Sequence, residues 1–372
     1  MLRPRHLLFT TILLSLSVGA IAQVDVLYVA SQSTGSQYSL VTYNVNPTTA
    51  AATQAGSPIS ISANGMVPVT VNGKNYLYVW DSTAVWVYST DARGVPSGNA
   101  VQRMNYGFSH TVTRFLVDPN GKFAYACLSW YDAHYDNLAA IYLFTIDQST
   151  GELTNTNQVV ANYGPNQYIQ LLDFQFGQTG KRLYAYYADD GPHTCIDGYY
   201  YYTLKTDGSL GPQTSLVYAQ DDCSGAGAVA VSDALSGSSS ACCGAGSGLV
   251  TVVSNANYKQ QASCEFSPEF CADEAAGLYF DPANENAFFA DRDTTTTYIL
   301  HIDFSTSQLE STSYSIPNNW PLHFSPDSRL VYAVNSGDIE IYALQSSTGD
   351  LTANTSLTAL GRVSVATATL KQ

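Results

Sequence analysis

The chain has 372 residues, of which 45% are hydrophobic, 12% aromatic and only 12% charged. Fifteen lysines and arginines against 30 aspartates and glutamates give a formal charge of −15, which excludes a general nucleic-acid surface because such surfaces need clustered cations. The low charge density excludes a long coiled coil, and the apolar and aromatic content excludes a disordered chain. The composition therefore indicates a folded, acidic, β-rich protein.

The first 22 residues have the pattern of a secretory signal peptide. Arg3 and Arg5 form a short basic start, an apolar run follows, and Ala-Ile-Ala before position 23 is a small-residue cleavage site. The run is shorter than the about 20 residues that a membrane-spanning helix needs, and no later stretch is apolar enough. We therefore predict that residues 1–22 are removed, that residues 23–372 form one domain, and that the protein is secreted or periplasmic with no membrane span.

A strand–turn–strand unit recurs along the rest of the chain. Its clearest copies cover residues 115–153 and 322–351, and each has two apolar strands around a polar turn, a third strand, and a Ser-Thr-Gly turn. Weaker copies begin near residues 69, 174, 228 and 278. The alternation of apolar and polar residues predicts strands, and the spacing of roughly 45–58 residues is that of a four-stranded propeller blade.

The two chain ends supply a seventh unit. Residues 24–30 have the pattern of a second strand with no first strand before it, and residues 363–370 that of a first strand with nothing after it. Pairing the two segments would leave no open sheet edge. The sequence therefore predicts an all-β fold, a seven-bladed β-propeller of four-stranded blades whose ring is closed by pairing of the N- and C-terminal strands.

The segment at 325–335, Ser-Pro-Asp-Ser-Arg-Leu-Val-Tyr-Ala-Val-Asn, and Ser-Thr-Gly-Asp-Leu at 347–351 resemble the seven-bladed lactonase-like propellers of the 6-phosphogluconolactonase type. As a pattern, the resemblance covers nearly the whole chain after the signal peptide, and it implies the propeller fold. Members of that family commonly carry Pro-Arg-His before the apolar core of the inner strand. The equivalent positions here read Asn-Trp-Pro at 319–321 and Val-Thr-Arg at 112–114, without the Arg-His pair.

The strand order assigns the loops to two faces of the propeller. The turns at 118–122 and 148–152 lie on one face and are short, whereas the loops after the second strands and between blades lie on the other face and are long. Long loops more often carry binding groups, so we expect a pocket at that mouth of the central channel. The ligand-binding side chains expected there are Trp130, Tyr131, Tyr135, Asp189, Asp190, His193, Asp291 and Arg292.

The candidate catalytic residues are His110, Arg114 and His134. A histidine base with an arginine cation could hydrolyse or isomerise a lactone. The alternative for the first two is a satisfied polar layer lining the channel, and for His134 an exposed loop position. His323 lies inside an inner strand and is interpreted as structural. Other catalytic motifs are absent, the aspartate pairs lack EF-hand spacing, and we expect no cofactor and no metal.

The cysteines predict a reinforced face. In an exported protein, six clustered cysteines indicate three disulfides that pin long loops, with 15 connectivities open. On the strand assignment all six lie in loops of the long-looped face, whereas Cys127 lies in a strand and is expected to be buried. The clustered residues are Cys195, Cys223, Cys242, Cys243, Cys264 and Cys271.

Two classes of function remain open. The first is a binding or scaffolding module that recognises a protein, peptide or glycan through the disulfide-stapled, loop-rich face. The second is a lactonase-like carboxylic ester hydrolase with its site at the mouth of the central channel. The absent Arg-His pair, the scattered histidines and the acidic balance favour the first class. We expect a monomer with no nucleic-acid partner.

Overall fold

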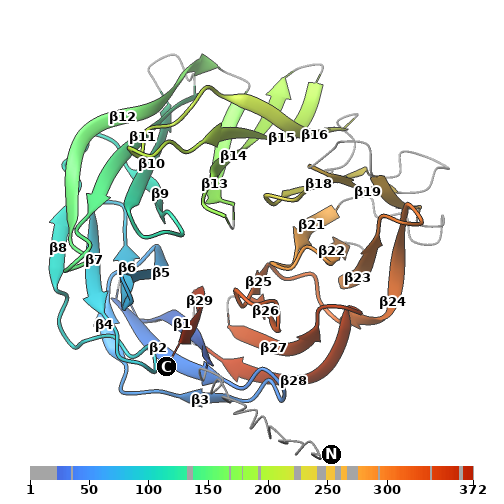
Figure 1. The fold of residues 1–372 in the computed structure, drawn as a ribbon, viewed down its shortest axis with the longest axis horizontal. Helices are drawn as coiled ribbons and strands as arrows, with labels where there is room; N and C mark the ends of the chain where they lie inside the picture. The colour runs from blue at the N-terminus through green and yellow to red at the C-terminus, as the bar shows by residue number, and fades with distance from the viewer. Residues whose placement is uncertain are drawn as a thin grey trace, which may run out of the picture.

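The computed structural model describes the chain in thirteen ranges, and in them the strands form blades around a common centre (Figure 1). Seven antiparallel blades are present, as the repeats predict. A single parallel bridge between Ser263 and Gln308 joins the outer strands of the fifth and sixth blades. The described ranges are 23–34, 37–131, 137–166, 169–177, 179–191, 194–221, 228–240, 249–255, 261–265, 275–291, 294–335, 337–359 and 363–371.

Each blade runs from an innermost strand at the centre to an outermost strand at the rim. Blade 1 contains β29 (Val363–Lys371), β1 (Gln23–Thr34), β2 (Gln37–Val45) and β3 (Ala52–Gln54), with β4 (Ile59–Ile61) also pairing with β2. Blade 2 contains β5 (Gly65–Val71), β6 (Lys74–Trp80), β7 (Ala84–Ser89) and β8 (Gln102–Asn105). Blade 3 contains β9 (Val112–Val117), β10 (Phe123–Tyr131), β11 (Asn137–Ile146) and β12 (Leu153–Asn166).

The other four blades repeat this order. Blade 4 contains β13 (Ile169–Phe176), β14 (Arg182–Gly191), β15 (Thr194–Thr203) and β16 (Thr214–Asp221). Blade 5 contains β17 (Val229–Val231), β18 (Leu235–Ser240), β19 (Leu249–Ser254) and β20 (Gln261–Glu265). Blade 6 contains β21 (Ala275–Phe280), β22 (Asn286–Asp291), β23 (Thr296–Asp303) and β24 (Gln308–Ile316). Blade 7 contains β25 (Leu322–Phe324), β26 (Leu330–Val334), β27 (Asp338–Gln345) and β28 (Asp350–Thr358).

The two chain ends close the ring as predicted. β1 and β29 pair antiparallel from Gln23 opposite Lys371 to Ser31 opposite Val363. Asp25 of β1 is 1% exposed, and it accepts a hydrogen bond from the hydroxyl of Thr369 in β29 (2.7 Å). The guanidinium of Arg329 in blade 7 also binds this carboxylate at 2.8 Å. The closing sheet is therefore held by its own ladder and by an ion pair to the neighbouring blade.

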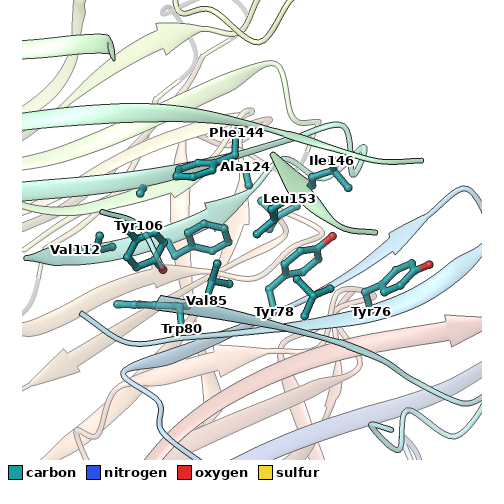
Figure 2. Packing of buried hydrophobic residues seen from close by; sticks show 14 of the residues in the cluster. Tyr76, Tyr78, Trp80, Val85, Tyr106, Val112, Ala124, Phe144, Ile146 and Leu153 are labelled. Atoms are coloured by element: carbon teal, nitrogen blue, oxygen red, sulfur yellow. The ribbon is translucent and has the colours of Figure 1, made fainter. Parts of the chain in front are cut away.

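The hydrophobic core lies between successive blades. Figure 2 shows the cluster between blades 2 and 3, where Tyr78 and Val85 of blade 2 lie opposite Ala124 and Phe144 of blade 3. All four side chains are fully buried. Because alternate residues of a strand point to opposite faces, each blade supplies one apolar set to each neighbour. This two-sided burial explains why the second strands read as almost continuous apolar runs.

Buried tyrosines connect neighbouring blades through their hydroxyl groups. Tyr78 of blade 2 donates to the carbonyl of Gly151 in blade 3, and Tyr125 of blade 3 donates to the carbonyl of Gly208 in blade 4, both at 2.8 Å. Gly151 has a φ of 73°, and a Cβ there would lie 2.6 Å from the ring of Tyr76. The turn between the third and fourth strands of blade 3 therefore needs glycine for its backbone conformation and for its close approach to blade 2.

The cysteine prediction is only partly visible in the described ranges. Cys127 is completely buried in β10, as expected. Cys195 lies near the start of β15 and Cys264 near the end of β20, so these two occupy strands and not the loops that the sequence predicted. Both strand ends face the long-looped side of the propeller. The other clustered cysteines, Cys223, Cys242, Cys243 and Cys271, lie outside the described residues, and the disulfides stay a prediction.

Residues 1–22 also lie outside the described ranges, so the signal peptide stays a prediction. The described ranges hold no helix with the length and apolar character needed to cross a membrane.

Candidate active site in the central channel

A cavity of about 640 Å³ lies at one end of the central channel. Its walls come from the innermost strands β5, β9, β25 and β29 and from the ends of β6 and β26. The innermost strands contribute mainly their first residues, and these begin where the chain enters from the preceding blade. The cavity therefore lies on the long-looped face. Its polar lining residues are Asn64, Arg114, His323, Asn335, Ser364 and Thr367.

Arg114 and His323 reach the cavity from different blades. Arg114 lies on β9 of blade 3, His323 lies on β25 of blade 7, and both side chains are exposed to the cavity. His323 touches the solvent of the cavity but is also crowded by protein. This crowding, and then the positive charge of Arg114, lowers the pKa of His323 to about 4. The imidazole is therefore neutral at neutral pH and can accept a proton, but it is a weaker base than an ordinary histidine.

The remaining cavity wall is mostly uncharged. No aspartate or glutamate is among the described residues that line it, so Arg114 is their only charged side chain when His323 is neutral. On the blade 2 side the wall is formed by Gly65 and Trp80, which are paired across β5 and β6. A Cβ at position 65 would lie 2.7 Å from the indole, so glycine allows the innermost strand to pass close to Trp80.

The innermost strands also present backbone groups to the channel. Each of β5, β9, β25 and β29 pairs with a neighbour inside its blade on one edge only. The N–H and C=O groups of the other edge are directed toward the centre of the ring. The cavity therefore combines a neutral imidazole, one cation and backbone hydrogen-bond donors.

The predicted residues His110 and Trp130 lie together on blade 3, His110 just before β9 and Trp130 near the end of β10. Their rings are stacked with centroids 4.2 Å apart and an interplanar angle of 5°. His110 is exposed, Trp130 is half-buried against the core between blades 2 and 3, and the adjacent Tyr131 is 59% exposed. None of the three is among the residues that line the cavity. The structure thus separates Arg114, in the cavity, from His110, which the sequence paired with it.

The other predicted ligand-binding residues are spread over blades 3, 4 and 6. Asp189 and Asp190 lie near the end of β14. Asp291 ends β22, is 1% exposed and accepts a hydrogen bond from the hydroxyl of Thr294 at 2.8 Å. This bond gives Asp291 a role in holding the following loop. His134, Tyr135, His193 and Arg292 lie outside the described residues.

The sequence interpretation did not include His323 in the site. It treated this histidine as structural because it lies in an innermost strand, where apolar side chains are expected. The repeat gave no signal for it, because the position that is Leu116 in blade 3 is Thr70, Gln175 and Tyr279 in other copies. A polar side chain at this position is therefore common in the repeat and does not by itself mark His323 as functional.

Comparisons with known proteins give the fold. No protein-family model and no curated protein matches the sequence. Solved structures do match. A periplasmic gluconolactonase of Pseudomonas aeruginosa has a TM-score of 0.59 at 12% identity, covering 94% of this chain and 99% of that chain. A candidate 6-phosphogluconolactonase of Bacteroides fragilis has a TM-score of 0.58 at 14% identity, covering 93% and 98%.

A protein of Lactobacillus plantarum also matches, with a TM-score of 0.55 at 14% identity over 93% of this chain and 99% of that chain. The three likenesses extend over almost the entire length of each protein. The chain has the fold of the lactonase-like seven-bladed propellers, as its repeats indicated. At these identities the likeness concerns the fold, and function has to be argued from the site.

Proposed function

We propose that this protein is a lactone hydrolase that acts in the central cavity. The observation that carries the proposal is that a neutral histidine, His323, and a cation, Arg114, line the same cavity. The cavity volume of about 640 Å³ is in the range of small-molecule sites. The gluconolactonase fold of the Pseudomonas aeruginosa protein supports the same reaction class by analogy.

In the proposed reaction, neutral His323 takes a proton from a water molecule as the water oxygen attacks the lactone carbonyl carbon. The negative charge that develops on the carbonyl oxygen is stabilised by backbone N–H donors of the innermost strands and by the positive potential of Arg114. The tetrahedral intermediate then breaks its ring C–O bond. The imidazolium returns the proton to the leaving alkoxide, and the product is an open-chain hydroxy acid.

The proposal changes one catalytic assignment and keeps another. Arg114 stays in the site, and His323 replaces His110 as the base because His110 is stacked on Trp130 and does not line the cavity. His134 keeps its sequence-based interpretation, since it lies outside the described residues.

The test is hydrolysis of five- and six-membered lactones by the purified protein, followed by acid release at constant pH. The expected result is turnover by the wild type, a loss of about 100-fold or more in kcat in His323→Gln, and little change in His110→Gln. Equal losses in both variants, or loss only in His110→Gln, would reject His323 as the base. Absence of turnover on every lactone would reject the hydrolase.

A second candidate is a binding module on the long-looped face of blade 3. It is favoured by one observation, the exposed aromatic side chains of His110 and Tyr131 beside half-buried Trp130. Aromatic anchors of this kind recognise peptides and sugars. Because His110 and Trp130 are stacked, either substitution alone would disturb both. Tyr131→Ala is the cleaner test, and it should weaken ligand binding while leaving lactone turnover unchanged.

A further inference from the structure

The indole of Trp80 lies against a glycine in the wall of the cavity. Trp80 ends β6 and is paired with Gly65, the first residue of β5, and both residues line the cavity. A Cβ at position 65 would lie 2.7 Å from both Nε1 and Cε2 of the indole. The edge of the ring that carries the N–H is therefore the edge next to the glycine, and any larger residue there would cover it.

This indole N–H has no hydrogen-bond partner among the described residues. Trp80 is 4% exposed and belongs to the cluster between blades 2 and 3, at the end of it that holds Val112 and Tyr106 (Figure 2). The hydroxyl of Tyr106 also lacks a partner there, but that oxygen is sealed from solvent, whereas Nε1 of Trp80 is not. A donor that is buried on its other sides and open to a cavity favours a ligand that supplies an acceptor.

The chemistry of the indole limits which group it can bind. An indole N–H only donates, whereas the amide of Asn64, the hydroxyl of Ser364 and a neutral imidazole can each donate or accept. Trp80 is thus the neutral, donor-only side chain among the described residues that line the cavity. It can bind an oxygen that gains negative charge without placing a second positive charge beside His323.

We infer that Trp80 is a catalytic residue of the proposed hydrolase, and that its indole N–H donates a hydrogen bond to the lactone carbonyl oxygen. The inference rests on the proposed function and adds a side-chain donor to the backbone donors of the innermost strands. As the water oxygen bonds to the carbonyl carbon, an electron pair of the C=O bond moves onto this oxygen, and the hydrogen bond to it strengthens. When the ring C–O bond breaks, the C=O bond forms again and the alkoxide takes the proton from His323. Trp80 gives up no proton.

Gly65 is a positioning residue in this arrangement. Its φ lies outside the left-handed region, so glycine is not needed there for the backbone conformation. The property that position 65 requires is the missing Cβ, because a methyl group would occupy the space next to Nε1. The glycine therefore keeps the N–H of Trp80 open to the cavity.

The first test replaces Trp80 by 3-benzothienylalanine, an isostere in which sulfur takes the place of the N–H. γ-Butyrolactone is the probe, because the two ester oxygens are its only polar atoms and any effect of the N–H acts through them. The variant should lose about 100-fold in kcat with little change in KM, as expected for the loss of one oxyanion donor. The same replacement at Trp86 on β7, outside the cavity, is the control and should leave kcat unchanged.

The second test identifies the oxygen that the N–H binds. In γ-thionobutyrolactone sulfur replaces the carbonyl oxygen, and sulfur is a weak acceptor. The preference of the wild type for the oxygen compound, as a ratio of kcat/KM values, should fall about 10-fold or more in the Trp80 variant. An unchanged ratio, or an unchanged kcat on γ-butyrolactone, would overturn the inference and leave the hydrolase standing.

Gly65→Ala tests the same contact without changing the indole. Its methyl group should displace or cover Nε1 and lower kcat while leaving KM nearly unchanged. Gly98→Ala is the control, because Gly98 also has an ordinary φ and a Cβ there meets no atom within 4 Å. Equal kcat values in the two alanine variants would overturn the assignment of the N–H to the cavity wall.

Absence of lactone turnover by the wild type would reject the hydrolase, and NMR spectroscopy then decides the inference about Trp80. The chain has four tryptophans, so labelling with nitrogen-15 gives four indole N–H signals, and that of Trp80 is absent in its benzothienylalanine variant. δ-Valerolactam is an unreactive ring amide with a strong carbonyl acceptor. It should move the proton resonance of Trp80 downfield and leave that of Trp86 in place. A Trp80 signal that does not move during the titration would overturn the inference.

Discussion

Replacing Arg329 by methionine should destabilise the closure of the ring. Arg329→Met keeps the aliphatic stem of the side chain and removes the guanidinium that binds Asp25 at 2.8 Å. The Asp25 carboxylate is 1% exposed and would keep only the hydroxyl hydrogen bond of Thr369. Asp25 lies on β1 opposite Thr369 of β29, so the loss of stability acts where the first and last strands pair.

The size of the effect follows from the burial of the two partners. Breaking a fully buried ion pair costs about 3–5 kcal/mol, and an exposed pair contributes about 0–1 kcal/mol. Asp25 is buried, but the side chain of Arg329 is 40% exposed, so we expect a loss of about 2 kcal/mol in the free energy of unfolding. Asp25→Asn should cost about 1 kcal/mol or less, because it removes the buried charge together with its need for a partner.

Equilibrium urea denaturation followed by tryptophan fluorescence measures both values. Arg93→Met is the control, since Arg93 pairs with Asp91 at 3.0 Å and both side chains are exposed, at 60% and 43%. If Arg329→Met costs no more than Arg93→Met, the buried pair does not stabilise the closure. Burial raises the pKa of Asp25. The loss in Arg329→Met should therefore shrink as the pH falls and Asp25 takes up its proton, because a neutral carboxyl group no longer needs the cation.

Three further predictions follow from the turns, the site and the cysteines. Gly151→Ala should lower the free energy of unfolding by about 1–3 kcal/mol more than Gly73→Ala. Both glycines have a φ near 75°, but an added Cβ meets a tyrosine ring only at Gly151. Comparable urea midpoints of the two variants would contradict this prediction. In the pH profile of kcat/KM, the fall on the acid side should have its midpoint near pH 4, the pKa of His323. In Arg114→Gln this midpoint should move to higher pH, because the charge of Arg114 lowers the pKa. A midpoint near pH 6.5 in the wild type would contradict the prediction. Non-reducing peptide mapping of exported protein should find three disulfides among the six clustered cysteines, and six free thiols there would refute the reinforced face.

The blade architecture could be predicted because it depends on local patterns that repeat. Alternating apolar residues in segments such as 322–333 determine the strands, and the turn residues after them determine the hairpins. The incomplete units at 24–30 and 363–370 predicted their own pairing, because each lacks the strand that the other supplies. The register from Gln23 opposite Lys371 onward agrees with that expectation.

The site could be predicted only in part, because its residues are distant in sequence and belong to different blades. Arg114 was identified from its position at the start of an innermost strand, but its neighbour in the cavity is His323, more than 200 positions away. His110 is close to Arg114 in sequence, but it lies before the first residue of β9, so the strand does not hold its side chain on the same side as that of Arg114. His110 instead packs on Trp130 near the end of β10.

The repeat pattern was enough to predict the strands, the number of blades and the face on which the long loops lie. These properties arise from contacts between residues within one blade, and their signal recurs in six units and in the two half-units at the chain ends. Only the tertiary structure decided which side chains share the cavity, because the closed ring brings β9 of blade 3 and β25 of blade 7 to the same channel. It also lowers the pKa of His323, since the surrounding protein and the charge of Arg114 act on this histidine only after the ring has closed.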